Sequence, residues 1–139
     1  MNKNVEEAIL HKVATEPYAK ILGLKLVKLE LGYALVEMVY ERNMTNIYDI
    51  IHGGAVFSLI DEAFEISCAT YGKVTFALSM TVSYHSSPPE GSVLRAESKE
   101  IDRSEKTPTY DIKVTDGDSN LIASCLAMAY RKKEKLPFL

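Results

Sequence analysis

The sequence is short of the residues that build metal sites, disulfide frameworks and membrane spans. It has no tryptophan, two cysteines and three histidines in 139 residues. Cys68 and Cys125 are far apart and lie in no CxxC or His/Cys cluster, so we expect buried, reduced thiols rather than structural zinc or a disulfide. No apolar run is long enough to span a membrane. The amino-terminal stretch lacks the apolar block of a signal peptide, so we expect a cytoplasmic protein.

A strong excess of charge of either sign is also missing. The formal net charge is -3, which gives no reason to expect a nucleic-acid partner. Hydrophobic residues make up 47% of the chain and charged residues 25%, a balance typical of a globular domain with one core. We therefore expect a single domain over residues 1–139, with no resident metal and no redox cofactor.

Residues 46–71 (NIYDIIHGGAVFSLIDEAFEISCATY) form the segment around which the rest of the chain is arranged. After His52 they read as one long helix that is apolar nearly all round, and such a helix is normally buried. Three carboxylates lie on this helix. Burying a carboxylate costs free energy unless it is paired or has a role in function. Two adjacent glycines, Gly53 and Gly54, open the helix. This favours close approach of the backbone to a ligand.

The elements on either side of this helix indicate the fold class. We expect a helix at 4–15 and a helical turn at 18–22, and strands at 24–31, 33–40, 74–86, 92–101, 108–115 and 121–131. No βαβ alternation is present, so a mostly antiparallel sheet around the long helix fits best, in the α+β class. In the strand at 74–86 the large side chains alternate with small ones, which predicts that the large ones cover the helix: Phe76, Leu78, Met80, Val82 and Tyr84.

The same helix offers the two groups that acyl transfer requires. Backbone N–H groups at a helix N-terminus, here at Gly53, can hold a developing oxyanion, and a carboxylate can act as base or nucleophile. Asp61 lies eight positions after Gly53, which is roughly 12 Å along a helix. Both groups can contact one carbonyl only if they belong to different subunits. A two-fold dimer with antiparallel central helices provides that arrangement twice.

Helical spacing favours Asp61 over the other carboxylates. Ser58, Glu62 and Glu65 share one polar stripe, which can be solvated or hydrogen-bonded. Asp61 instead lies beside apolar side chains, namely Phe57, Phe64 and Cys68. The sequence alone leaves other interpretations open. The two glycines can serve packing alone, and Asp61 can be an inert, paired core residue. Asn46 can be a turn residue, and His52 can either be a general base or only shape the loop.

Residues 52–64, HGGAVFSLIDEAF, resemble the HGGxxFxLxDxAF signature of the phenylacetate-pathway (PaaI-type) branch of the hotdog-fold thioesterases. The order of elements agrees along essentially the whole chain. The resemblance implies a hotdog fold and hydrolysis of acyl-coenzyme A by dimers that commonly pair into tetramers. It implies that Asp61 is the catalytic carboxylate, that the Gly53 N–H polarises the thioester carbonyl, and that Asn46 and His52 shape the site beside Gly53.

Further residues are expected to bind the substrate. Gly54 and the nearby aromatic residues Phe57 and Phe64 are candidates for the acyl pocket, and Ser79 is near the position of a site serine in wider family members. Coenzyme A carries phosphates, so a local basic patch is needed. We favour Arg103 and Lys106 for it over the run at 131–133.

Three other functions are alternatives to thioester hydrolysis for this sequence. A hotdog hydratase or dehydratase would need a His–acid pair near the helix, and its usual proline-rich loop is missing here. A non-catalytic acyl-CoA-binding regulator would lack the acid, whereas Asp61 is present. The third alternative is a purely structural oligomer.

Overall fold

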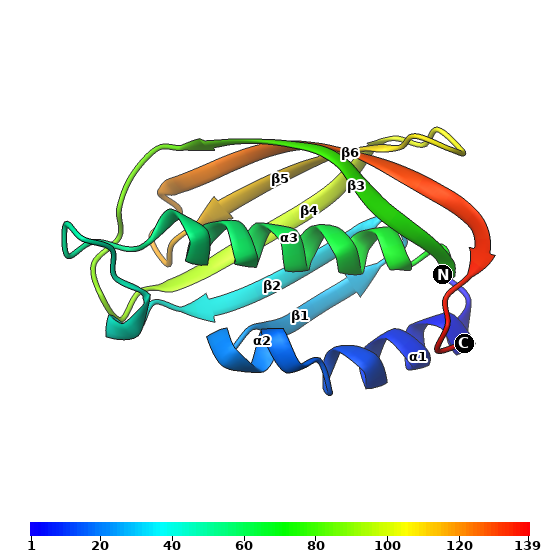
Figure 1. Cartoon of the computed structure of the whole chain (residues 1–139), viewed down its shortest axis with the longest axis horizontal. Coiled ribbons are helices and arrows are strands. Elements are labelled where there is room, and N and C mark those ends of the chain that lie inside the picture. Colours follow the sequence, from blue (N-terminus) through cyan, green and yellow to red (C-terminus); the bar gives the residue numbers. More distant parts are fainter.

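The helix α3 (Gly53–Ala69) is the element on which the others pack. In the computed structural model, which describes residues 1–139, α3 lies along the concave face of a curved sheet (Figure 1). Val56, Leu59 and Ile60 of α3 are buried against the rest of the core. Full burial of such a side chain contributes roughly 1.5–3 kcal/mol, so packing rather than helix propensity holds α3 in place.

The remaining elements confirm the predicted order and the α+β class. The sheet has six antiparallel strands in the order β1-β2-β4-β5-β6-β3, and the amino-terminal helices lie beside β1 (Figure 1). A short 3₁₀ turn, η1 (Arg42–Met44), lies in the loop before α3. The other bounds are α1 (Lys3–Val13), α2 (Pro17–Leu22), β1 (Lys25–Glu30), β2 (Tyr33–Val39), β3 (Lys73–Tyr84), β4 (Val93–Asp102), β5 (Thr109–Thr115) and β6 (Leu121–Lys135).

The strand β3 departs from its predicted pattern. Its pairing with β6 shifts register between Ala77 and Ser79, and a β-bulge of this kind moves the following side chains to the other face. Met80 and Val82 pack against the core, as predicted. The prediction that Phe76 and Leu78 cover the helix is wrong, because they are 54% and 57% exposed. β3 is also the last strand of the sheet, so its outer edge has no partner within the chain.

A buried polar cluster joins Arg131 on β6 to Glu100 on β4 across the intervening strand β5. The Arg131 guanidinium donates to Glu100 Oε1 at 2.9 Å, and the Tyr71 hydroxyl donates to Glu100 Oε2. The side chains of Arg131 and Glu100 are only 6% and 2% exposed. Arg131 is therefore a structural residue here and is not part of a surface patch for phosphates.

The two cysteines are free and buried, as the sequence predicts. Burial raises the pKa of the Cys68 thiol to about 12 and that of Cys125 to about 11. Neither thiol is therefore activated as a nucleophile. None of the helices combines the length and hydrophobicity needed to cross a bilayer.

Candidate active site

The N-terminus of α3 presents one backbone donor with no acceptor inside the chain. The Gly54 N–H donates to His52 Nδ1 at 2.8 Å, so His52 caps the helix with its side chain. The N–H groups of Ala55 and Val56 donate to the His52 carbonyl at 3.0 and 3.4 Å. The Gly53 N–H is left free at the positive end of the helix dipole. A free donor in that position can hold a developing oxyanion.

Each glycine of the pair has a steric reason to be glycine. A Cβ on Gly54 would lie 2.9 Å from His52 Nδ1, so a side chain there would displace the cap. A Cβ on Gly53 would lie 3.3 Å from Cζ of Tyr84, whose hydroxyl donates to the Gly53 carbonyl at 3.2 Å. These contacts support the packing interpretation of the glycines, and the ligand interpretation stays a prediction. Sequence reasoning missed Tyr84 at this place; its position at the end of the strand at 74–86 was the available signal.

Asp61 has no hydrogen-bond or ion-pair partner within the chain. It is half-buried, and burial raises the pKa of its carboxyl above the usual value. The interpretation of Asp61 as an inert, paired core residue therefore finds no partner to support it. Within one chain it lies eight positions along the helix from Gly53, which is roughly 12 Å. A single chain cannot place both groups on one carbonyl.

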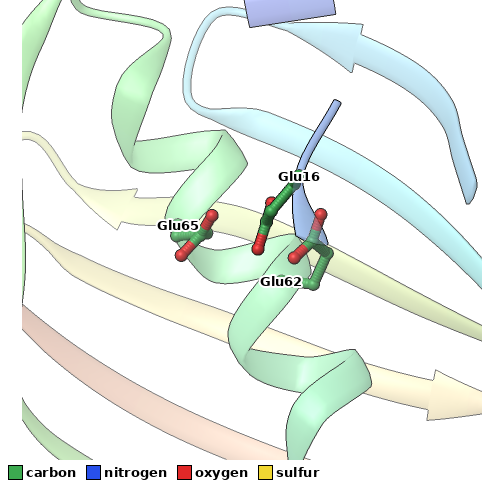
Figure 2. A group of neighbouring side chains, drawn as sticks. All are labelled: Glu16, Glu62 and Glu65. Atoms are coloured by element: carbon green, nitrogen blue, oxygen red, sulfur yellow. The ribbon is translucent and has the colours of Figure 1, made fainter. Parts of the chain in front are cut away.

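Of the two interpretations left open for the polar stripe, solvated or hydrogen-bonded, the solvated one does not hold for Glu62. Glu62 is only 4% exposed, whereas Glu65 is exposed. The segment that joins α1 to α2 folds over this side of α3 and brings Glu16 against Glu62 (Figure 2). Asp61 is thus less enclosed than Glu62. It stays the better candidate because a catalytic carboxylate must reach the substrate, and Glu62 is covered.

Asn46 and His52 both hold the approach to α3 in shape. The Asn46 side-chain oxygen accepts from the N–H groups of Tyr48 and Ile50 at 2.8 and 3.4 Å. Asn46 is therefore a turn residue, as one open interpretation had it. His52 accepts through Nδ1, so this nitrogen is occupied by the cap. That contact favours the loop-shaping interpretation of His52, and its role as a general base stays a prediction.

The residues predicted to bind the acyl group separate into two sets. Gly54 lines a cavity of about 250 Å³ beside the α3 N-terminus, together with His52. Phe57 is partly exposed and does not line this cavity, so its place in the acyl pocket stays a prediction. Phe64 is 2% exposed and meets the Tyr110 ring edge-on, so it is a core residue and the pocket prediction for it is corrected. Ser79 lies on the outer face of the sheet, away from this chain's own α3, so its role in substrate binding stays a prediction. It pairs with the exposed Met128, and side chains opposite each other in an antiparallel pair share a face, here the outer one.

The two predicted phosphate-binding residues are exposed but differ in their surroundings. Arg103 has a 77% exposed side chain whose Nε lies 3.9 Å from Glu100 Oε2. Lys106 lines a cavity of about 350 Å³. Three further lysines, Lys73, Lys132 and Lys133, line the same cavity and outnumber its two acidic residues, Glu105 and Glu134. The positive charge is therefore concentrated around Lys106 rather than Arg103. This cavity adjoins the start of β3, beyond the C-terminal end of α3.

Comparison with known proteins identifies the family. A model of the "Thioesterase superfamily" matches residues 48–123, which contain all of α3. A "Putative esterase" of Archaeoglobus fulgidus is 35% identical over 118 residues, which cover 85% of this chain and 77% of that protein. "Acyl-coenzyme A thioesterase PaaI" of Escherichia coli is 28% identical over 113 residues, 81% of each chain.

A solved structure supports the same fold. The structure of the Escherichia coli PaaI protein superposes with a TM-score of 0.90 at 24% identity, covering 94% of this chain and 95% of that one. The six-stranded antiparallel sheet around one long helix is therefore the hotdog architecture, as the resemblance implied. The chain belongs to the thioesterase superfamily, in its PaaI-type hotdog branch, and is a thioester hydrolase.

Proposed function

We propose that the protein hydrolyses acyl-coenzyme A thioesters with Asp61 of one subunit and the Gly53 N–H of the partner subunit. One observation carries this proposal: α3 has a capped N-terminus with a single free donor at Gly53, and an unpartnered, half-buried carboxylate at Asp61. The substrate class is supported by the Escherichia coli relative, whose name is acyl-coenzyme A thioesterase. Aryl-acyl and short or medium acyl groups are the proposed range.

The two groups divide the reaction between them. The thioester oxygen accepts a hydrogen bond from the Gly53 N–H, which stabilises the negative charge that develops there. Asp61 takes a proton from water, and the resulting hydroxide attacks the carbonyl carbon. Collapse of the tetrahedral intermediate breaks the carbon–sulfur bond, and the proton held by Asp61 passes to the leaving sulfur. The products are the coenzyme A thiol and a carboxylic acid, and Asp61 is again a carboxylate. In the alternative route, the Asp61 carboxylate attacks directly and water then hydrolyses the mixed anhydride.

The proposed dimer places α3 of one subunit antiparallel to α3 of the other. The free outer edge of β3 and its exposed apolar residues Phe76 and Leu78 favour this side of the chain as the contact. A second copy that pairs there removes an unsatisfied sheet edge and covers apolar surface. Further pairing into a dimer of dimers is proposed from the resemblance alone.

The cavity around Lys106 is the proposed site for the coenzyme A phosphates. It lies near the C-terminal end of α3, and α3 spans 17 residues, which is about 25 Å. Within one subunit this cavity is therefore far from Gly53. Antiparallel helices bring the C-terminal end of one α3 toward the N-terminal end of the other. The phosphates would then be bound by the subunit that supplies Asp61.

The test is thiol release from a panel of aryl, short-chain and medium-chain acyl-coenzyme A esters. Wild type is expected to release thiol from at least one member, and Asp61→Asn is expected to lose about 10²–10⁴-fold, the usual contribution of a general base. A matched control is Glu7→Gln, since Glu7 is exposed on α1. If wild type binds the esters but releases no thiol, the protein is better described as a non-catalytic acyl-CoA-binding regulator. Full activity in Asp61→Asn would reject the residue assignment.

A further inference from the structure

Three carboxylates from two separate parts of the chain converge on one point. Glu16 precedes α2 as its N-cap residue, whereas Glu62 and Glu65 are one turn apart on α3. One carboxylate oxygen from each lies within 4.8 Å of the other two. Figure 2 shows the three side chains pointing toward one another from the two backbone segments. The function proposed above uses none of them.

The cluster has no positive partner. None of the three carboxylates forms an ion pair, although six ion pairs are found elsewhere in the chain. Glu62 is 4% exposed, and its Oε1 is buried without any hydrogen-bond partner. Glu16 makes no capping hydrogen bond with its side chain. A buried carboxylate left without a partner costs several kcal/mol unless it takes up a proton or meets a positive group. A cation bound among the three carboxylates would be such a positive group.

The ligand atoms suit a hard cation. All three are carboxylate oxygens, with no nitrogen or sulfur among them, which favours Mg²⁺, Ca²⁺ or Mn²⁺ over softer metals. Calcium–oxygen distances are about 2.3–2.6 Å, so two ligands on opposite sides of one ion lie about 5 Å apart. The 4.8 Å span of the three oxygens fits that limit. Small inward movements would suit the shorter distances of Mg²⁺.

An entry path is present beside the cluster. Glu16 and Glu65 line a cavity of about 370 Å³ whose other walls come from α1, the start of β3 and the carboxyl-terminal residues. Lys12 and Lys73 also line this cavity, yet neither pairs with a cluster carboxylate. An ion can therefore reach Glu16 and Glu65 from the cavity and contact Glu62 behind them.

We propose that Glu16, Glu62 and Glu65 form a binding site for one hard divalent cation of the Mg²⁺, Ca²⁺ or Mn²⁺ class. Such an ion supplies the positive charge that the chain does not, and it ties the α1–α2 connection to α3. The protonation behaviour agrees with the geometry: burial, and then the neighbouring carboxylates, raise the pKa of Glu62 to about 8 and that of Glu65 to about 7. A bound cation would relieve that repulsion.

Calorimetric titration of the full chain, stripped of metal with a chelator, tests the proposal with CaCl₂, MgCl₂ and MnCl₂ separately. Wild type is expected to bind one ion per chain of at least one kind. Glu16→Gln and Glu65→Gln are expected to weaken binding by about tenfold or more, since even residues that only support a ligand cost 10–100-fold. Glu65 is the exposed member of the cluster and Glu16 is partly exposed, so both variants carry little risk of misfolding. The control, Glu7→Gln, should bind like wild type.

Thermal unfolding gives a second readout that is independent of activity. A saturating concentration of the bound ion should raise Tm of wild type and of Glu7→Gln, but not of Glu16→Gln. The proposal is overturned if none of the three ions binds at millimolar concentration, or if wild type and Glu16→Gln bind equally. An experimental structure with a basic side chain of a second copy in the cluster would also overturn it. None of these outcomes bears on whether thiol is released.

Discussion

At the scale of single residues, the Gly53–Gly54 pair separates into two roles. The Gly54 N–H donates a hydrogen bond to the His52 side chain that caps the helix, and the absence of a Cβ on Gly54 leaves room for the imidazole. Gly53 keeps its N–H free and lies against the Tyr84 ring. Neither glycine needs a positive φ, since neither is among the positive-φ residues. The free N–H of Gly53 can therefore be removed without changing the backbone conformation.

Gly53→Pro removes that N–H and is expected to lower kcat by about 10²–10³-fold, the usual cost of one oxyanion donor. Proline is well accepted at the first position of a helix, and His52 has the extended ψ of 131° that a following proline requires. Gly53→Ala is the matched control, because it adds the same Cβ near Tyr84 and keeps the N–H. Equal losses of kcat in both variants would show that packing, not the donor, matters at this position.

A substitution at Phe64 distinguishes a core residue from one that lines the acyl pocket. Phe64→Leu should lower the free energy of unfolding by about 1–3 kcal/mol, because it removes the edge-on contact with Tyr110 and leaves a void. It should leave KM for the acyl-coenzyme A ester within about twofold, since a core residue does not touch substrate. Denaturant unfolding and steady-state kinetics measure the two effects. A several-fold rise in KM with unchanged stability would show that Phe64 lines the substrate pocket and is not a core residue.

The residue scale also shows what sequence alone could and could not predict. The type and spacing of Gly53 and Asp61 were sufficient to nominate them, because their chemistry depends on positions along one helix. The burial of Glu62 was not predictable in this way. It depends on the α1–α2 connection, which is more than 40 residues away in the chain and folds over that face of α3.

At the scale of elements, the N-terminus of α3 depends on a histidine cap. His52→Ala should lower the free energy of unfolding by about 0.5–2 kcal/mol, the usual cost of losing an N-cap side chain. His52→Asn should recover most of that loss, because asparagine is among the strongest N-cap residues. Chemical denaturation of the three proteins measures the difference. If the Ala and Asn variants are equally destabilised, the Nδ1 contact does not contribute as a cap.

The strand β3 shows why an element can be predicted while its faces are not. Alternation correctly identified a strand at 74–86, and the helix, loop and strand order followed from composition and turn residues. A bulge between Ala77 and Ser79 then reversed the alternation. Nothing in the local sequence marks this bulge, since no glycine lies within β3. The bulge placed Ser79 on the outer face and Leu78 at the exposed edge.

At the scale of the whole molecule, the free edge of β3 indicates where a second copy pairs. Leu78→Glu places a charge on this edge and should shift sedimentation toward the monomer, with loss of thiol release. Val27→Glu is the matched control: Val27 is 51% exposed and lies on β1, at the opposite edge of the sheet. It should leave both mass and activity unchanged. An unchanged mass and activity in Leu78→Glu would place the subunit contact elsewhere.

The shared site is the central claim, and mixing two inactive variants tests it most directly. Asp61→Asn subunits lack the carboxylate, and Gly53→Pro subunits lack the donor, so neither homodimer has a complete site. After unfolding and refolding together in equal amounts, about half of the dimers contain one subunit of each kind, and each of these has one intact site of two. Thiol release should therefore recover to about a quarter of the wild-type rate. A mixture that is no more active than the separate variants would contradict a site built from two subunits.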